Sequence, residues 1–193
     1  KNYLLFSSVL APLAISSTAC SSTEKTEKTS KPNVIVILAD DLGYGGVSAY
    51  GSKTISTPNI DKLANGGVCF TDGHATSATS TPSRYAMFTG SYPWKNKNAK
   101  ILPGDAPLLI DTAQFTMPKM FRNAGYTTAA IGKWHLGMGS GNPDWNERVT
   151  PGANEIGFDY SCLIAATNDR VPTVYVENGT VVGLDPEDPI QVS

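Results

Sequence analysis

The chain has 193 residues, of which 40% are hydrophobic and 17% charged, and its formal net charge is −2. This length fits one domain or part of a larger one, and the composition is typical of a globular chain. The charge balance argues against a nucleic-acid-binding protein, which usually carries a basic patch, so no nucleic-acid partner is expected. An anionic small substrate remains compatible with it, because one local cluster of cations is enough to bind such a molecule.

The first 20 residues have the features of an export signal. Lys1 precedes an apolar-rich stretch, residues 3–15, and small residues come directly before Cys20. The apolar stretch is too short for a stable transmembrane helix. A cysteine at this place is typical of a bacterial lipoprotein, in which Cys20 becomes the lipidated first residue; an ordinary cleaved signal is the alternative. Residues 21–32 would then form a polar, flexible tether.

These features predict where the protein acts. We expect an exported protein, a periplasmic or outer-membrane lipoprotein of a bacterium, whose contact with a membrane is made through the lipid anchor only.

Residues 34–38 begin the predicted fold. They form a continuous, β-rich apolar run, which predicts a strand buried on both faces. The next element is a helix that begins at Thr57-Pro58, with Thr57 as the cap and Pro58 in the first helical position, and that ends at an Asn-Gly-Gly run. Its predicted inner face consists of Ile60, Leu63 and Ala64.

Strands and helices then alternate along the chain. Residues 68–71 predict a short strand, residues 82–88 and 115–123 predict two helices, and residues 127–131 predict a further buried strand. Alternation of this kind implies an α/β sheet with parallel members.

The pattern changes after Gly137, where glycines and prolines predict a long loop, and such loops often line active sites. Residues 173–177 alternate between polar and apolar, Asn178-Gly179 follows, and residues 180–182 return as a strand. This arrangement predicts a β-hairpin with a type I′ turn.

Two cysteines remain if Cys20 is lipidated. The chain has no C-x-x-C motif and no Cys/His ligand spacing, so zinc bound through cysteines is not expected. Cys69, between Val68 and Phe70, is predicted to be a buried apolar filler. Whether Cys69 pairs with Cys162 stays open, because sequence alone does not establish a disulfide.

Two adjacent carboxylates, Asp40 and Asp41, follow the first predicted strand. Neighbouring side chains in a strand point to opposite faces, so the pair can serve one metal only where the strand ends and the backbone turns. The glycines at 43, 45 and 46 supply that freedom. Hard oxygen ligands at the carboxyl end of a strand suit Ca²⁺ or Mg²⁺. Taken alone, the pair is equally a solvated Asp-Asp turn.

The string Ser80-Thr81-Pro82-Ser83-Arg84 precedes the second predicted helix. Pro82 suits the first helical position and Thr81 is a candidate cap, so Ser80 would lie at a helix N-terminus, where free N–H groups favour an anion. Arg84 adds a cation with fork-shaped donors. The alternative is a plain Ser-Thr-Pro capping segment.

A third string, Gly132-Lys133-Trp134-His135-Leu136-Gly137, follows the strand predicted at 127–131. If the extended path continues, Lys133 and His135 point to one side and Trp134 to the other. The only other histidine, His74, lies in a predicted loop and is expected to be structural.

In this order, Asp40-Asp41, the 80–84 string with Thr89-Gly90, and the 132–137 string resemble the N-terminal half of the type I sulfatases, within the alkaline-phosphatase superfamily. The resemblance runs from about Pro32 to the end of the chain. It implies an α/β fold, an alkaline-phosphatase-like mixed central sheet flanked by helices, of which residues 33–193 are the N-terminal, incomplete portion. It further implies that a second Asp/Asn metal pair and more Lys and His residues come later, so the chain alone is expected to be inactive.

What the resemblance implies chemically is hydrolysis of a sulfate ester on a sulfated glycan or monosaccharide. Ser80 would be oxidised to formylglycine, the nucleophile, and Asp40, Asp41 and Ser80 would bind Ca²⁺, which is favoured over Mg²⁺. The remaining catalytic residues, which would position sulfate and neutralise charge, are Arg84, Lys133 and His135. A serine in this motif implies maturation by an anaerobic radical S-adenosylmethionine enzyme.

Asn168-Asp169-Arg170 resembles a region that lines the substrate pocket of carbohydrate sulfatases, although a loop ion pair or a cap before the hairpin is equally compatible. Two other functions stay open. One is a phosphatase or phosphodiesterase of the same superfamily, which would use unmodified Ser80 and zinc. The other is an inactive, truncated sugar-binding lipoprotein.

Overall fold

The computed structural model describes residues 30–192, so the predicted export signal, Cys20 and most of the predicted tether lie outside the described residues. The chain divides into two compact units, Lys1–Leu38 and Ala39–Ser193. In the described part of the chain, no helix has both the length and the apolar character needed to cross a membrane.

Residues 34–38 form neither helix nor strand, and their side chains are exposed; Ile35 and Ile37 are 83% and 80% exposed. The prediction of a strand buried on both faces is therefore wrong here. A strand of that kind needs neighbouring strands and packed helices over both faces. Residues 30–38, the described part of the first unit, contain no other element that supplies them.

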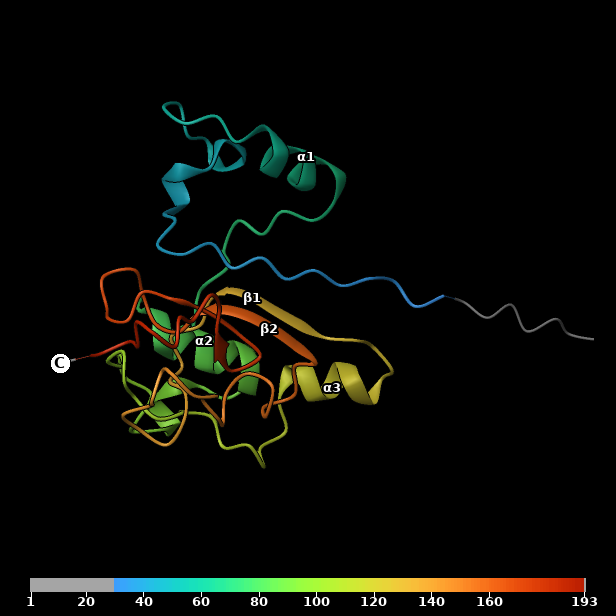
Figure 1. The fold of residues 1–193 in the computed structure, drawn as a ribbon. Helices are drawn as coiled ribbons and strands as arrows, with labels where there is room; N and C mark the ends of the chain where they lie inside the picture. Colours follow the sequence, from blue (N-terminus) through green and yellow to red (C-terminus); the bar gives the residue numbers. More distant parts are fainter. Residues whose placement is uncertain (1–29, 193) are drawn as a thin grey trace, which may run out of the picture. The chain divides into compact units, whose positions relative to one another are not determined.

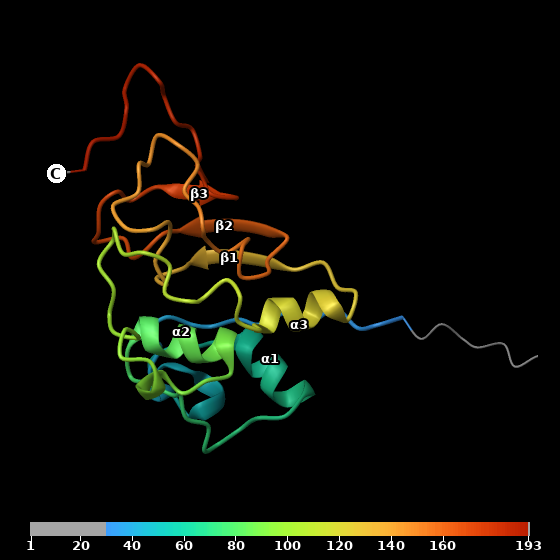
Figure 2. The same cartoon turned by 90° about the horizontal axis from the view of Figure 1, so that it is seen from below.

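The second unit contains a four-stranded mixed sheet in the order β1-β2-β3-β4 (Figures 1 and 2). β1 (Ala129–Lys133) pairs in parallel with β2 (Tyr160–Ile164). β3 (Tyr175–Glu177) is antiparallel to β2, and β4 (Thr180–Val181) is antiparallel to β3. The predicted α/β class with a mixed sheet and a parallel pair is confirmed.

The individual strands agree less well with the prediction. β1 begins two residues later than expected, and it is not fully buried, because Ile131 is 70% exposed. β2 was not predicted at all, although Leu163 within it is 1% exposed. The hairpin of β3 and β4 is confirmed, since Asn178 and Gly179 both have positive φ, 48° and 89°, as a type I′ turn requires.

The three predicted helices are all present: α1 (Pro58–Gly66), α2 (Ser80–Thr89) and α3 (Met117–Asn123). Three short 3-10 helices accompany them: η1 (Tyr44–Gly46), η2 (Ser48–Tyr50) and η3 (Pro93–Lys95). Figures 1 and 2 show α2 and α3 next to each other.

The first helix, α1, begins at Pro58 as predicted, but two details are wrong. The Thr57 hydroxyl caps no helix N–H; it hydrogen-bonds the Ser48 hydroxyl and the Asp61 carboxylate instead. The predicted inner face is largely exposed, at 40% for Ile60 and 70% for Leu63. An apolar stripe on a helix shows which face can be buried, but burial also needs an element packed against it.

The second helix, α2, begins two residues earlier than predicted, with Thr79 rather than Thr81 at the N-cap position. Pro82 is therefore its third residue. Proline is tolerated there because the first four N–H groups of a helix have no acceptor within the helix. In α3, the Thr116 side chain accepts from the Lys119 N–H, and the helix ends before Gly125 at φ 81°.

Residues 68–71 do not form the short strand that was predicted. As a consequence Cys69 is exposed rather than a buried filler, because no partner strand shields it. Cys162, in β2, is partly buried, and both are free thiols.

The core of the second unit lies between the sheet, α2 and the long loop after Gly137, which has no helix or strand until β2, as predicted. This loop contributes much of the buried apolar surface, so it is a packed part of the fold. The large buried side chains of this core include Trp134, Leu136, Trp145, Ile156, Leu163 and Val176.

Gly137 provides a direct test of how tightly this loop is packed. Its φ is 75°, and a Cβ at this position would lie 1.9 Å from the Pro107 carbonyl oxygen. We expect Gly137→Ala to lower the free energy of unfolding by about 3 kcal/mol or more, because strain and overlap combine. Gly132→Ala is the matched control, since Gly132 has φ 98° but open space around it, and should cost about 1–2 kcal/mol. Urea unfolding measures both; equal losses would contradict this account.

Candidate active site

Ser80 is the first residue of α2, and two side chains converge on its hydroxyl oxygen. Arg84 Nε donates to Ser80 Oγ over 3.0 Å, and His135 Nδ1 lies 3.1 Å from the same atom. Ser80 is half-buried, whereas Arg84 and His135 are only 6% and 3% exposed. The hydroxyl therefore sits at a helix N-terminus between a fixed cation and an imidazole, which is a favourable place for developing negative charge.

The start of α2 is tied to the end of β1 and to the segment after it, which carries His135. Thr81 is fully buried, and its hydroxyl donates to the His135 carbonyl oxygen over 2.8 Å. Arg84 Nη1 donates to the Lys133 carbonyl oxygen over 2.7 Å. These two bonds fix the distance between the 80–84 and 132–137 strings, so residues about 50 positions apart in the sequence share one site.

Asp40 is held by both cations of the site. Lys133 Nζ lies 2.6 Å from one carboxylate oxygen and Arg84 Nη2 lies 3.1 Å from the other. The hydrogen bond from Lys133 lowers the pKa of Asp40 below its ordinary value, with a smaller contribution from Arg84, while partial burial acts in the opposite direction. Asp40 is therefore ionised at neutral pH.

Asp41 itself makes the turn that the sequence assigned to the following glycines. Its φ is 54°, whereas Gly43 is extended at φ −72°. The two carboxylates therefore do not lie along a regular strand. Asp41 is exposed.

The oxygens of Asp40, Asp41 and Ser80 have the chemistry that Ca²⁺ prefers. Ca²⁺ takes about six to eight oxygen ligands, so these residues would supply only part of its shell. Residues 30–192 contain no cluster of three or more His, Cys, Asp or Glu side chains able to hold a metal. The donor types fit the ion, and the metal site stays a prediction.

His135 departs from the expected extended path. β1 ends at Lys133, and His135 has a φ of 54°, so the chain turns at this point. Lys133 and His135 nevertheless both reach the site, while Trp134 is buried at 1% exposure and stacks on Phe88 with ring centroids 5.7 Å apart. The division of side chains is as predicted, but a turn produces it.

The imidazole of His135 contacts Ser80 through one ring nitrogen, and Leu102 and Arg170 through the other. His135 Nε2 lies 3.0 Å from the Leu102 carbonyl oxygen and 2.9 Å from Arg170 Nη1. Burial lowers the pKa of His135; the Leu102 carbonyl opposes this, and the cations Arg170, Lys133 and Arg84 add to the lowering. In the neutral imidazole, Nδ1 either accepts a hydrogen bond from the Ser80 hydroxyl or donates one to it, depending on which ring nitrogen carries the hydrogen.

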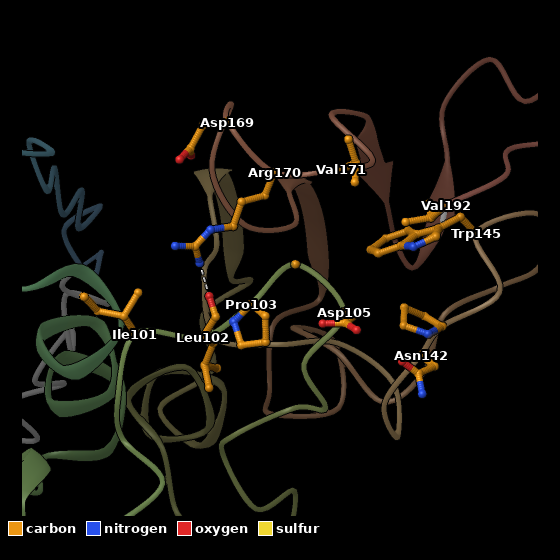
Figure 3. A pocket seen from close by; sticks show the side chains of 12 residues that line it. Ile101, Leu102, Pro103, Asp105, Asn142, Trp145, Asp169, Arg170, Val171 and Val192 are labelled. Carbon is orange, nitrogen blue, oxygen red and sulfur yellow. Dashed lines mark hydrogen bonds between the residues drawn. The ribbon is translucent and has the colours of Figure 1, made fainter.

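Leu102 and Arg170, which contact His135 Nε2, line a pocket of about 910 Å³ (Figure 3). Asp169 and Arg170 line it, and the Arg170 guanidinium turns toward Leu102 and donates to its carbonyl oxygen. Asn168 does not line the pocket; its carbonyl accepts from the Thr173 hydroxyl. Of the three residues proposed for substrate binding, the structure therefore brings two to the pocket.

Several pocket residues were missed by sequence reasoning. They come from the Pro103-Gly104 turn and from the loop after Gly141, both of which carry turn residues that could have marked them as lining loops. The polar and aromatic members of this set are Asp105, Asn142 and Trp145. His74 lies outside the site; it is exposed and pairs with Asp72 over 2.7 Å.

Comparison with known proteins agrees with this arrangement. The family model described as Sulfatase matches residues 32–179. N-acetylgalactosamine-6-O-sulfatase of Bacteroides thetaiotaomicron is 57% identical over 168 residues, which cover 86% of this chain and 33% of that protein. Human steryl-sulfatase is 45% identical over 121 residues, covering 59% of this chain and 21% of that protein.

Solved structures give the same result. A protein of glycosaminoglycan metabolism from Bacteroides thetaiotaomicron superposes with a TM-score of 0.81 at 59% identity, over 83% of this chain and 34% of that one. Ps i-CgsB, solved in complex with k-i-k-neocarrahexaose, superposes with a TM-score of 0.66 at 33% identity, over 79% of this chain and 37% of that one. The chain spans about a third of the length of these proteins, and it belongs to the sulfatase family.

Proposed function

We propose that the protein carrying this chain hydrolyses a sulfate ester on a carbohydrate, with a formylglycine derived from Ser80 as the nucleophile. The observation that carries this proposal is the position of Ser80 Oγ at the N-terminus of α2, within 3.0 Å of Arg84 Nε and 3.1 Å of His135 Nδ1. Family membership and the 57% identity to a carbohydrate sulfatase support it.

The oxidation of Ser80 has a chemical reason. A serine hydroxyl that attacked sulfur would leave a stable serine sulfate, and its removal would need a second displacement by water. A hydrated aldehyde carries two hydroxyls on one carbon. One attacks sulfur, displaces the sugar hydroxyl and becomes sulfated. Loss of the proton from the other then forms the carbonyl and breaks the bond from carbon to the sulfate oxygen, which restores formylglycine.

The residues of this chain serve both steps. His135 Nδ1 is within hydrogen-bonding distance of the nucleophilic oxygen and can hold or take its proton. Arg84 and Lys133, with the α2 N-terminus, offset the negative charge of the sulfate group. Asp40 keeps these two cations in place through its ion pairs. Ca²⁺ bound by Asp40 and Asp41 would supply further polarisation of the sulfate oxygens.

We propose a 6-O-sulfated N-acetylgalactosamine as the sugar, because the bacterial relative with 57% identity acts on that group. Asp169 and Arg170 would hydrogen-bond sugar hydroxyls in the pocket. The test compares turnover of N-acetylgalactosamine 6-sulfate with that of N-acetylglucosamine 6-sulfate and of a sugar phosphate. Preference for the phosphate ester would contradict the proposal and favour a phosphatase that uses unmodified Ser80.

We predict that Ser80 is formylglycine in protein purified from an anaerobic bacterium that makes the radical S-adenosylmethionine maturation enzyme. Mass spectrometry of the tryptic peptide that ends at Arg84 should show a species lighter than the serine form by two hydrogens. A hydrazide reagent should label the same peptide, because it reacts with the aldehyde and not with serine. Finding the serine form alone, in protein that hydrolyses sulfate esters, would overturn the proposed nucleophile.

We also propose that Cys20 carries a lipid anchor and that the protein is exported to the periplasm or the outer membrane. Cells grown with a labelled fatty acid should incorporate label into the native protein and not into Cys20→Ala. Cys162→Ala is the matched control, since Cys162 is a partly buried residue of β2 and should not change labelling. Equal labelling of native protein and Cys20→Ala would rule this anchor out.

A further inference from the structure

The segment between α2 and the pocket carries a pair of exposed aromatic rings. Tyr92 and Trp94 stack with ring centroids 4.0 Å apart and an interplanar angle of 15°. They are 51% and 69% exposed; Trp94 belongs to η3, and Tyr92 comes directly before it. Tyr and Trp are enriched at interaction surfaces, because each combines a large apolar ring with a polar group that can stay in water.

Three lysines follow directly: Lys95, Lys97 and Lys100, all exposed. Within residues 30–192 none of them takes part in an ion pair with the chain. The chain as a whole has a net charge of −2, yet no Asp or Glu occurs between Asp72 and Asp105. The segment is thus a locally basic surface with no internal partner, and it attracts anions.

This segment leads directly into the pocket. Lys100 precedes Ile101 and Leu102, which line the pocket, and the Leu102 carbonyl accepts from Arg170 and faces His135. The basic segment therefore ends one residue before the pocket lining begins in the sequence.

We propose that Tyr92, Trp94, Lys95, Lys97 and Lys100, here called the 92–100 surface, bind the continuing chain of a sulfated glycan whose reacting sugar occupies the pocket. This inference rests on the proposed sulfatase function. Sulfate groups of neighbouring sugars would pair with the lysines. The apolar faces of the sugar rings would pack on the Trp94 side chain, and Asn96 and Asn98 would hydrogen-bond sugar hydroxyls. The protein would then prefer polymeric over monomeric substrate, because contacts outside the pocket add affinity.

The test separates chain binding from turnover of a single sugar. We would measure Kd for sulfated chondroitin oligosaccharides of increasing length, and kcat/KM for N-acetylgalactosamine 6-sulfate, in the mature protein. For Lys95→Gln/Lys97→Gln we expect Kd for the longer oligosaccharides to rise on the order of fivefold, the size that two exposed ion pairs give. Trp94→Ala should raise the same Kd by a similar factor. Turnover of the monosaccharide should not change in either variant.

Lys53→Gln/Lys62→Gln is the matched control, because it removes the same charge from two exposed lysines outside the surface. It should leave both measurements unchanged. If it weakens oligosaccharide binding as much as Lys95→Gln/Lys97→Gln does, net charge is responsible and the proposed surface is wrong. Unchanged oligosaccharide affinity in the surface variants would also overturn it. Binding of single-stranded DNA, another polyanion, is measured in parallel, and variants that lose affinity for DNA but not for the oligosaccharides would overturn it as well. Absence of monosaccharide turnover in the unmutated protein, by contrast, would speak against the sulfatase function itself.

Discussion

Replacing Ser80 by alanine is expected to lower kcat/KM for a sulfate ester by about 10⁴-fold or more, as removal of a covalent nucleophile does in other hydrolases. Alanine cannot be oxidised to an aldehyde, so both the attacking hydroxyl and the step that releases sulfate are lost. Arg84 and His135 would still meet at the vacated position, and substrate should bind with little change in affinity. The loss should therefore appear in kcat.

Ser83→Ala is the control for this variant, because Ser83 belongs to the same helix and the same motif. Its hydroxyl donates to the Ser77 carbonyl oxygen over 2.7 Å rather than to Ser80. We expect a loss of about 1 kcal/mol in the free energy of unfolding, the usual value of one hydrogen bond, and near-normal kcat. A Ser80→Ala protein that retained a substantial fraction of the activity would show that another group attacks sulfur.

Local signals predicted the helices well, because helix ends depend on a few residues near them. Pro58 and the Gly-Gly run bound α1, and Thr116 and Gly125 bound α3. The error of two residues at the start of α2 has a local cause, since proline is allowed at several positions of the first turn.

Burial was predicted less well, because it depends on what packs against an apolar face. Residues 34–38, Leu63 and Ile131 are apolar in patterns typical of buried elements, yet all are exposed here. The missed strand β2 shows the opposite error. Its polar Ser161 is 1% exposed because the hydroxyl donates to the Asn154 side chain, a partner that the sequence does not reveal.

The side chains around Ser80 were predicted from the sequence. The three strings supplied Asp40, Ser80, Arg84, Lys133 and His135, and the structure brings these residues together. Besides the pocket side chains Asp105, Asn142 and Trp145, the missed part is made by backbone. The Leu102 carbonyl, which faces His135 and accepts from Arg170, could have belonged to any residue type, so no motif marks it.

The two aspartates should respond differently to loss of charge, and this difference tests the proposed metal site. Asp40 has two tasks, because it also forms ion pairs with Lys133 and Arg84 at 2.6 and 3.1 Å. Asp41 is exposed and has the predicted metal-binding task only. We expect Asp40→Asn to lower kcat by about 10³-fold, since both cations lose their partner along with a metal ligand. Asp41→Asn should weaken Ca²⁺ binding and regain much of its activity when the Ca²⁺ concentration is raised.

Two measurements decide this prediction: kcat as a function of Ca²⁺ concentration, and the shift in Tm that Ca²⁺ causes. A ligand that binds the folded state raises Tm by an amount that grows with the ratio of its concentration to Kd, so the shift at one Ca²⁺ concentration should shrink in both aspartate variants and remain in the control. Asp72→Asn serves as that control, because Asp72 is an exposed aspartate whose partner is His74 and which lies outside the site. Chelation should abolish turnover of the unmutated protein.

Two outcomes would contradict this account. Full turnover of an Asp40→Asn/Asp41→Asn protein without Ca²⁺ would contradict the metal site. If added Ca²⁺ restored the kcat of both single variants equally, the ion-pair task assigned to Asp40 would be wrong. The ion pairs of Asp40 make such equal rescue unexpected, since added Ca²⁺ restores no anion between Lys133 and Arg84.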